Sequence, residues 1–336
     1  MKPLNRRQTL RLIGAAAATG LASPALAANK KIKVGALRFT SHSGSFIAAE
    51  RGYFADAGLD VEFEFFQAAQ PMAVAIASGD IDYAVTAVSG GLISLAQKGA
   101  IKVIGGALSE EDGIDGQKYL ISDASYQAGI KTLKDLDGKK YAVTQAGSSF
   151  HYMGAKMATA EGINLQFTPL QKVGAIIGAM KSGQVDGWSI VPHIAKPLAK
   201  AGAWHMVANV SDFIPNYQVT TVFTSAGNAA NERGMTESFL AGFANGVDDY
   251  AAAMIDQTAD QDEMIDLIHK YVYTDRPLEK AAPSIINGTM RISTNAALNL
   301  GSLQDQLDWF QSEGLVDADI KLVQLVDPSY VETTGV

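Results

Sequence analysis

The chain has 336 residues, of which 47% are hydrophobic and 18% charged, and it contains no cysteine. The lack of cysteine excludes disulfide bonds, thiolate catalysis and zinc or iron–sulfur centres held by cysteine. Its 35 acidic and 27 basic residues give a net charge of −8, which argues against nucleic acid and anionic membrane surfaces as partners. The length is sufficient for two lobes with hydrophobic cores of their own.

The first 27 residues have the three-part layout of a secretory signal peptide. Residues 1–11 carry four basic side chains and no acidic one, residues 12–22 are small and mostly apolar, and Ala25-Leu26-Ala27 is a small-x-small cleavage site. The apolar part is too short for a bilayer, which needs about 20 residues. The run 5–11, with Arg6 and Arg7, is similar to a twin-arginine export signal. We expect export to the periplasm and cleavage after Ala27, which would leave 23 basic against 35 acidic residues, a net charge of −12.

Short apolar runs then alternate with stretches of helical periodicity, which predict strands and helices in turn. Strands are expected at 32–37, 59–66, 81–88 and 101–108, and helices at 45–57, 70–78 and 92–98. This alternation predicts a parallel sheet with helices on both faces.

The segment 109–116, with four acids and two glycines, interrupts the pattern, and a second series of the same kind follows. Strands are expected at 119–122, 139–144, 165–170, 185–190 and 204–209, and helices at 148–161, 175–182 and 192–201. The segment 217–224 is expected to be a strand that returns to the first series. The rest of the chain is expected to be helical at 237–256, 261–271, 279–287 and 300–312.

Two such series and a helical tail predict an α/β fold with two lobes joined by two crossings, near 117–122 and 219–224. The first lobe would comprise 28–118 and 225–336, and the second 119–224. A single large sheet is the alternative. In open α/β sheets ligands bind beyond the carboxyl ends of the strands, so a ligand is expected in a cleft between the lobes. Movement about the crossings would close that cleft.

A set of short motifs resembles one protein family through its order and spacing. The motifs are Ala49-Glu50-Arg51-Gly52-Tyr53-Phe54, Gly58-Leu59-Asp60-Val61-Glu62, Ala77-Ser78-Gly79-Asp80-Ile81-Asp82, Leu133-Lys134-Asp135-Leu136-Asp137-Gly138-Lys139-Lys140, Gly147-Ser148, Gly183-Gln184-Val185-Asp186-Gly187 and Asp308-Trp309-Phe310 with Gly314-Leu315-Val316. They resemble the solute-binding proteins for aliphatic sulfonates, taurine, nitrate and thiamine-pyrimidine precursors, which serve ABC importers. The resemblance covers nearly all of 31–331. It implies a type II periplasmic binding fold, a cleft that closes and a membrane permease as partner.

The segment Gly147-Ser148-Ser149 is the first candidate for binding an anion. It lies between a predicted strand and a predicted helix, where backbone amides and hydroxyls favour negative charge. A cap that serves only its own helix is the alternative. Arg38 directly follows the first strand and could hold a carboxylate or sulfonate through two hydrogen bonds, or could form a surface salt bridge instead.

Further candidates lie near other ends of strands and helices. His42, His151 and His193 could each donate a hydrogen bond to a ligand, or could be structural. Trp188 ends a strand of the second lobe, where it would form a stacking wall unless it packs in the core. Three polar residues complete the predicted rim, although each could be an ordinary loop residue: Gln70, Ser89 and Gln145.

The chain contains no GxSxG motif, no phosphate-binding loop and no pair of carboxylates on one helical face. We therefore predict a monomeric, non-enzymatic protein without cofactor or metal. It would capture a small organic anion, a sulfonate or a flat or aromatic carboxylate, for an ABC permease in the inner membrane. Two alternatives stay open: an enzyme of the same fold with His42 or His151 as a base, and a sensing module that reports to a membrane receptor.

Overall fold

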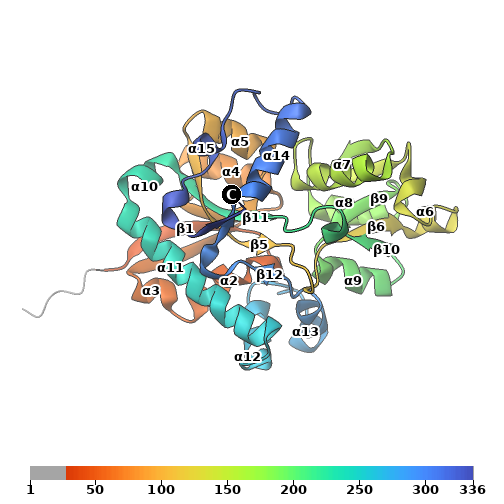
Figure 1. Ribbon diagram of the computed structural model, residues 1–336. Helices are drawn as coiled ribbons and strands as arrows, with labels where there is room; N and C mark the ends of the chain where they lie inside the picture. The colour runs from red at the N-terminus through yellow and green to blue at the C-terminus, as the bar shows by residue number, and fades with distance from the viewer. Residues whose placement is uncertain (1–27, 336) are drawn as a thin grey trace, which may run out of the picture.

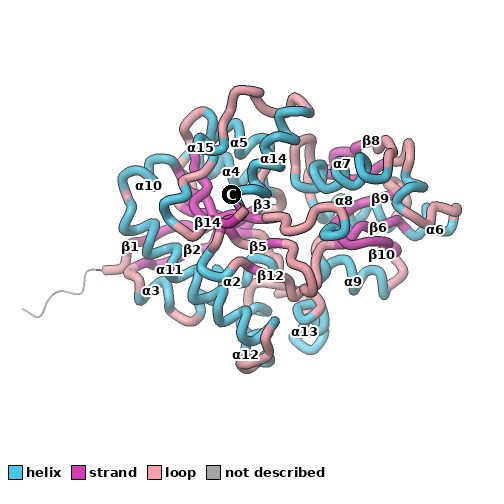
Figure 2. Tube along the Cα trace, viewed as in Figure 1, coloured by secondary structure: helices cyan, strands magenta, loops and turns pink. Residues whose placement is uncertain are grey.

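The computed structural model describes residues 28–335, which form two lobes (Figure 1). The predicted signal peptide, residues 1–27, lies outside the described residues. Each lobe has a sheet covered by helices, seen as two separate groups of strands in Figure 2. Within 28–335, no helix combines the length and the apolar character that a membrane crossing requires.

The first lobe is built on a five-stranded sheet with the order β2-β1-β3-β11-β4. Its strands are β1 (Lys30–Ala36), β2 (Leu59–Phe65), β3 (Tyr83–Ala87), β4 (Ile101–Gly106) and β11 (Thr220–Ser225). Strands β1, β2 and β3 are parallel, as predicted. The sheet as a whole is mixed, however, because β11 returns from the second lobe and inserts antiparallel between β3 and β4.

Helices from both ends of the chain cover this sheet, so that red-orange and teal-blue segments share one lobe in Figure 1. The N-terminal helices are α2 (Ser43–Glu50), α3 (Tyr53–Asp56), α4 (Ala69–Ser78) and α5 (Gly90–Gln97). The C-terminal helices are α10 (Ala226–Asn231), α11 (Arg233–Tyr250), α12 (Gln261–His269), α13 (Leu278–Ile286), α14 (Leu300–Ser312) and α15 (Leu322–Leu325). Two hydrophobic clusters, one on each face of the sheet, hold this lobe together.

The single helix predicted at 45–57 is wrong. The structure has two helices, α2 and α3, because Gly52 adopts a left-handed conformation with φ of 80°. A residue without Cβ takes this conformation at little cost, so Gly52 ends the first helix and lets the chain turn before the second.

The second lobe uses the order β10-β6-β9-β7-β8, with one continuous hydrophobic core. Its strands are β6 (Lys118–Ser122), β7 (Lys140–Val143), β8 (Gln166–Pro169), β9 (Gly187–Ile190) and β10 (Trp204–Asn209). Its helices are α6 (Asp123–Gln127), α7 (Ser149–Glu161), α8 (Val173–Lys181) and α9 (Pro192–Lys200). Strands β7, β8 and β9 are parallel, whereas β6 is antiparallel to both β9 and β10.

The two connections between the lobes lie side by side. Ser109, at the end of the short strand β5 (Leu108–Ser109), forms an antiparallel bridge with Gln218. The Glu110 amide donates to the Tyr217 carbonyl at 2.9 Å, and the Val219 amide donates to the Leu108 carbonyl at 2.9 Å. The lobes are therefore joined by one narrow pair of chain segments, the arrangement that hinge motion requires.

Close packing of α2 on α11 fixes the C-terminal helices to the first lobe. A Cβ atom on Gly246 of α11 would lie 2.2 Å from the carbonyl oxygen of Gly44 and 2.7 Å from the amide nitrogen of Ala48. Only a glycine allows the two backbones to approach this closely.

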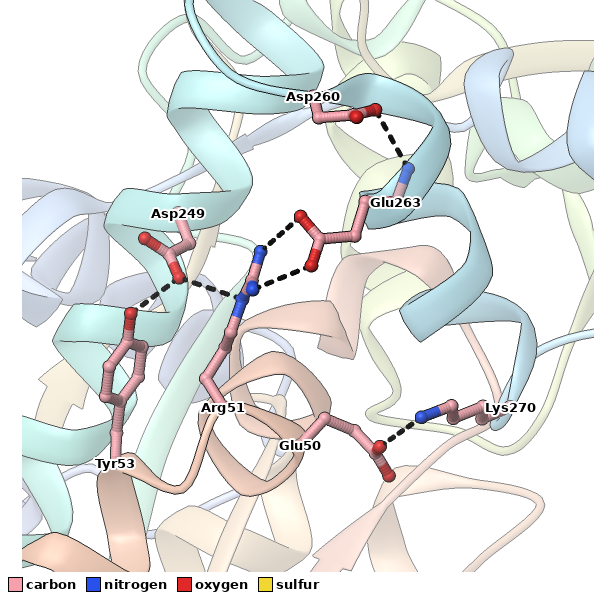
Figure 3. Close-up of polar contacts among 7 residues, drawn as sticks. All are labelled: Glu50, Arg51, Tyr53, Asp249, Asp260, Glu263 and Lys270. Carbon is pink, nitrogen blue, oxygen red and sulfur yellow. Dashed lines mark hydrogen bonds and ion pairs between the residues drawn. The ribbon is translucent and has the colours of Figure 1, made fainter.

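Ion pairs beside this contact fasten the same helices (Figure 3). The Arg51 guanidinium donates to both carboxylate oxygens of Glu263 at 2.8 and 2.9 Å, and its Nε lies 3.5 Å from Asp249. The Tyr53 hydroxyl donates to Asp249 at 2.7 Å, and Glu50 pairs with Lys270. The motif Glu50–Phe54, which carried the family resemblance, thus has a structural role in joining α2 and α3 to α11 and α12.

We predict that Gly246→Ala lowers the free energy of unfolding by about 1–3 kcal/mol, because the new methyl group would press on the α2 backbone. Gly234→Ala in the same helix is the matched control, since a Cβ there meets nothing within 4 Å. The control should leave stability unchanged or raise it by up to about 1 kcal/mol through helix propensity. Urea unfolding of both variants measures this, and equal stabilities would contradict the packing argument.

Candidate ligand-binding cleft

A cavity of about 60 Å³, here called the inner cavity, lies between the two lobes. The first lobe contributes the ends of β1 and β3 and the starts of α2 and α4, and the second contributes the starts of α7, α8 and α9 together with β9. The lining residues are Leu37, Phe39, Ser41, His42, Ala68, Ala69, Thr86, Ala87, Leu108, Gln117, Thr144, Ser148, Ser149, Phe150, Val173, Ile190, Val191, Val219 and Thr220. The predicted position of the ligand, between the lobes and beyond the strand ends, coincides with this cavity.

Five helices begin at the wall of the inner cavity. The N-cap residues of α2, α4, α7 and α9 are His42, Ala68, Ser148 and Val191, and Val173 is the first residue of α8. Of these four N-cap residues, only Ser148 accepts a capping hydrogen bond through its side chain. The amide groups at a helix N-terminus have no partner within the helix and carry about half a positive charge together. Five helix starts therefore lie around this cavity.

None of the residues that line the inner cavity is a lysine, arginine, aspartate or glutamate. Burial lowers the pKa of His42 to about 3, so this ring is neutral at physiological pH. The Nδ1 atom of His42 accepts a long hydrogen bond, 3.5 Å, from the amide of Leu37. The polar character of the cavity therefore comes from helix ends, hydroxyl groups, one amide and a neutral imidazole, among mostly apolar side chains.

A second, outer cavity of about 240 Å³ adjoins the first and shares Leu37, Phe39 and Val173 with it. The remaining residues that line it are Arg38, Phe66, Gln67, Gly174, Ile177, His193, Ile194, Pro197, Leu198, Tyr273 and Arg276. Two arginines and no acidic residue line this space. It is also the larger of the two cavities. Its volume exceeds the roughly 150 Å³ of a dry cavity that holds benzene.

Contacts between the lobes are present on more than one side of the cavities. The Gly90 amide at the start of α5 donates to the Gly147 carbonyl at 2.9 Å. Lys156 of α7 pairs with Asp305 of α14 at 2.9 Å, and the Tyr152 hydroxyl donates to the same carboxylate. The Tyr273 hydroxyl donates to the His193 carbonyl at 2.7 Å. The lobes are therefore drawn together around the cleft in this structure.

The structure brings His42, Ser148 and Ser149 together at the inner cavity. The Ser148 hydroxyl also accepts from the His151 amide at 3.4 Å, so it caps α7 while it faces the cavity. Capping of α7 therefore does not remove Ser148 from the cavity wall.

Arg38 lies elsewhere, at the outer cavity. Its Nη1 donates to the Tyr271 carbonyl at 3.0 Å, and its guanidinium carbon lies 3.7 Å from the centre of the Phe65 ring. Arg38 and Ser148, two candidates for binding an anionic group, therefore line different cavities.

The predicted rim residues Gln70, Ser89 and Gln145 do not line either cavity. The Ser89 hydroxyl caps α5 by accepting from the Leu92 amide at 3.2 Å, and it donates to Gln70 at 3.2 Å. The Gln145 carbonyl accepts from the Ser148 amide at 3.2 Å. These three residues shape the turns behind the cavity wall.

His151 and Trp188 are packed inside the protein. The His151 Nδ1 accepts from the Gly147 amide at 3.1 Å, its ring meets Phe167 and Trp309 edge-on, and burial lowers its pKa. Trp188 is fully buried in the second core, edge-on to Phe150 and Trp204, and does not line a cavity. Of the two readings that the sequence allowed for Trp188, core packing is the one observed.

Sequence reasoning missed Thr86, Thr144 and Gln117, which are buried and line the inner cavity. Thr86 is the second-to-last residue of β3, and Thr144 directly follows β7. Ser89 and Gln145 were selected because they lie near the ends of predicted strands. Thr86 and Thr144 lie near the ends of the same strands, three residues before Ser89 and one residue before Gln145. Gln117 immediately precedes β6 and has no comparable local signal.

Glu110 lies behind Gln117 in the first crossing and is 2% exposed. One oxygen accepts from the Gln117 amide at 3.0 Å and from its side chain at 3.3 Å, while Oε2 is buried without a partner. Burial raises the pKa of Glu110 to about 7. Among the described residues, no cluster of three or more histidine, aspartate or glutamate side chains could hold a metal ion.

The amino-acid sequence matches the NMT1/THI5-like family over residues 39–254. A protein of Brucella abortus, named as a binding protein without a stated ligand, is 23% identical over 266 residues, which cover 77% of each chain.

Solved structures with the same fold include proteins with different ligands. The alkanesulfonate-binding protein SsuA from Xanthomonas axonopodis pv. citri, bound to MOPS, has a TM-score of 0.68 at 15% identity, covering 90% of this chain and 98% of that one. The periplasmic nitrate-binding protein NrtA from Synechocystis PCC 6803 has a TM-score of 0.66 at 14% identity, covering 86% and 83%. A mutant of DszB with serine in place of a cysteine, in complex with biphenyl-2-sulfinic acid, has a TM-score of 0.56 at 12% identity, covering 90% and 97%.

Identities this low establish the fold alone. The two α/β lobes and their paired crossings have the periplasmic binding protein fold, and the predicted fold class is confirmed. The chain belongs to the NMT1/THI5-like family, because the match covers more than half of its length.

Two buried groups should give opposite contributions to the pH dependence of stability. Between pH 3 and 6.5 the unfolded state protonates His42 and the folded state does not, so this group destabilises the protein as the pH falls, by up to about 1.4 kcal/mol per pH unit. Glu110 holds a proton in the folded state up to about pH 7, so its contribution is lost as the pH rises from 4.5 to 7.

We therefore predict that His42→Gln makes the plot of unfolding free energy against pH rise less steeply between pH 4 and 6. Glu110→Gln should make it rise more steeply between pH 4.5 and 7. Urea unfolding at several pH values measures both slopes, and each variant serves as the control for the other. Slopes equal to the wild-type value would show that each group has the same pKa in the folded and the unfolded state.

Proposed function

We propose that this protein is the solute-binding component of an ABC importer, that it works in the periplasm, and that it captures a small organic anion by closing its two lobes. Membership of the NMT1/THI5-like family and the fold shared with SsuA and NrtA support this class of function. The side-by-side crossings at Ser109 and Gln218 support a hinge between the predicted lobes, 28–118 with 225–336 and 119–224. Because β11 (Thr220–Ser225) pairs within the first sheet, we place the end of the second lobe just before Thr220.

The observation that carries the proposal is the convergence of five helix N-termini on a cavity without any charged side chain. Each helix end stabilises a nearby anion by about 0.3–1 kcal/mol when exposed and by up to about 2 kcal/mol when partly buried. A cation would be repelled by the same five ends. An anion is thus the ligand class that this cavity favours.

The size of the inner cavity suits a small head group. Its volume of about 60 Å³ corresponds to roughly two water molecules, so the present arrangement accommodates a sulfonate, carboxylate or nitrate rather than an aromatic ring. Hydroxyl groups of Ser41, Thr86, Thr144, Ser148 and Ser149 are the donors available along its wall. We propose that these residues, with His42, select the head group of the ligand.

The residues argue against the enzymatic alternative. A general base is effective when its pKa is near the working pH, and burial holds that of His42 near 3. The Nδ1 of His151 already accepts a backbone hydrogen bond, and the ring does not line the cavity. We propose binding without turnover as the function.

A thermal-shift screen tests the proposal, with taurine, alkyl sulfonates, nitrate, bicarbonate, aromatic carboxylates, pyrimidines and amino acids as probes. An anion at about 100 times its Kd should add about 2.7 kcal/mol, which raises Tm by several degrees. Protein that has been unfolded and refolded is screened in parallel, to remove any ligand retained from expression. Stabilisation by uncharged or cationic compounds alone would contradict the anion site, and conversion of the bound compound would favour an enzyme.

We also predict that Asp305→Asn favours the open arrangement, because it weakens the contacts of Asp305 with Lys156 and Tyr152 across the cleft. An exposed ion pair contributes about 0.2–1 kcal/mol, so affinity for the strongest ligand of the screen should fall by a factor of about 1.4 to 5. The radius of gyration of the unliganded protein should increase in small-angle scattering.

Asp308→Asn is the matched control for Asp305→Asn. Asp308 lies in the same helix, but its carboxylate accepts from Gln304 of that helix and does not cross the cleft. Affinity and radius of gyration should keep their wild-type values in this variant. Equal effects of the two substitutions would mean that the Asp305 contacts do not hold the lobes together.

A further inference from the structure

The outer cavity contains the strongest concentration of positive side-chain charge near the cleft. Arg38, from the end of β1, and Arg276, from the segment between α12 and α13, both line it, and no acidic residue does. The whole chain carries a net charge of −8, so a cavity lined by two arginines and by no acidic residue differs from the protein as a whole.

Aromatic rings position both guanidinium groups. Arg38 lies 3.7 Å from the ring centre of Phe65 and uses one N–H for the Tyr271 carbonyl, which leaves most of its five N–H donors available. Arg276 lies 4.3 Å from the ring centre of Tyr273, and within residues 28–335 its one ion pair is a long one, 3.9 Å, to the exposed neighbour Asp275. Stacked guanidinium groups with free donors are suited to a carboxylate, sulfonate or phosphate.

His193 also lines this cavity, and one of its ring nitrogens has no hydrogen-bond partner among the described residues. Pro197 has no N–H, so the His193 carbonyl one turn earlier in α9 lacks its helical donor, and the Tyr273 hydroxyl donates to it at 2.7 Å. Because that hydroxyl proton is used, the 3.0 Å contact between His193 Nδ1 and the Tyr273 oxygen has the ring nitrogen as donor. The other ring nitrogen, Nε2, is buried and has no partner among the described residues.

Phe39 stands between the two cavities. It lines both, and its ring meets His42 edge-on at 6.3 Å and His193 edge-on at 5.1 Å between ring centres. His42 therefore lines the inner cavity and His193 lines the outer cavity, and both contact Phe39 between them. A ligand that passes Phe39 would reach from the five helix ends to the two arginines.

We propose that the outer cavity is a second anion subsite, in which Arg38 and Arg276 bind a second acidic group of the ligand beside His193. This inference rests on the proposed function, since the first acidic group occupies the inner cavity. The ligand is then a short dianion with an acidic group at each end, such as a sulfonate joined to a carboxylate. His193 lines the same subsite, so its ring reports whether the second acidic group is bound.

Nuclear magnetic resonance of the ¹⁵N-labelled histidine rings tests this, because each cavity has its own histidine. The probes are 3-sulfopropanoate, a dianion, and propanesulfonate, which lacks the carboxylate, at equal ionic strength set with chloride. We expect propanesulfonate to shift the His42 signals alone, and 3-sulfopropanoate to shift those of His42 and His193 and to bind at least tenfold more tightly. His205, which stacks on Tyr126 and pairs with Asp123 away from the cleft, is the internal control.

The double variant Arg38→Gln/Arg276→Gln should remove the advantage of the dianion and keep the affinity for propanesulfonate. Arg233→Gln, whose side chain pairs with Glu237 on α11, is the matched control and should bind both probes as the wild type does. A folded double variant that keeps the tenfold preference would overturn the inference.

The two histidines also separate this inference from the proposed function. Shifts of His42 alone with both probes would overturn the outer subsite and leave the inner anion site standing. Shifts of His193 alone would support the outer subsite and contradict the inner one. No shift of either ring with either probe at 100 mM would overturn both.

Discussion

The close approach of α2 and α11 at Gly44 and Gly246 is the constraint on which both cavities depend. It holds the last third of the chain against the first lobe, and the ion pairs of Arg51 and Glu50 fix the helices that follow. The start of α2 presents Ser41 and His42 to the inner cavity, while the segment after α12 presents Tyr273 and Arg276 to the outer one. A single helix contact thus sets the position of two walls that lie more than 200 residues apart in sequence.

Local sequence features predicted the strands of both five-stranded sheets and most of the longer helices, since apolar runs and helical periodicity depend on near neighbours. They missed the short helices α6, α10 and α15 and the two-residue strands, which are too short to show a period. They placed two lobes correctly, and they located the strand that returns to the first lobe. They did not indicate that β11 lies between β3 and β4, because strand order depends on contacts between distant segments. The break at Gly52 was also missed, although its glycine is visible, since the apolar pattern continues through Tyr53 and Phe54.

The site was predicted in part, for the same reason. Ser148 and Ser149 follow from the geometry of a strand that leads into a helix, and this geometry is local. Trp188 was expected at the end of its strand, but it is the second residue of β9. Whether its side chain faces the cleft or the core depends on the pleat, which a shift of one residue reverses. Arg276 has no local signal at all. It reaches the cavity only because α11 and α12 are fixed to α2, so no reading of residues 270–280 by themselves could select it.

The position of β11 has a consequence for the order in which the chain folds. The core of the second lobe is formed almost entirely by residues 108–219, so that lobe can become stable as a continuous unit. The first sheet lacks its inner strand until residue 225 has been synthesised, and until then β3 and β4 have no neighbour between them. Native contacts of such long sequence separation form slowly. This topology therefore delays completion of the first lobe relative to the second, and no change of sequence at the ligand site would alter that delay.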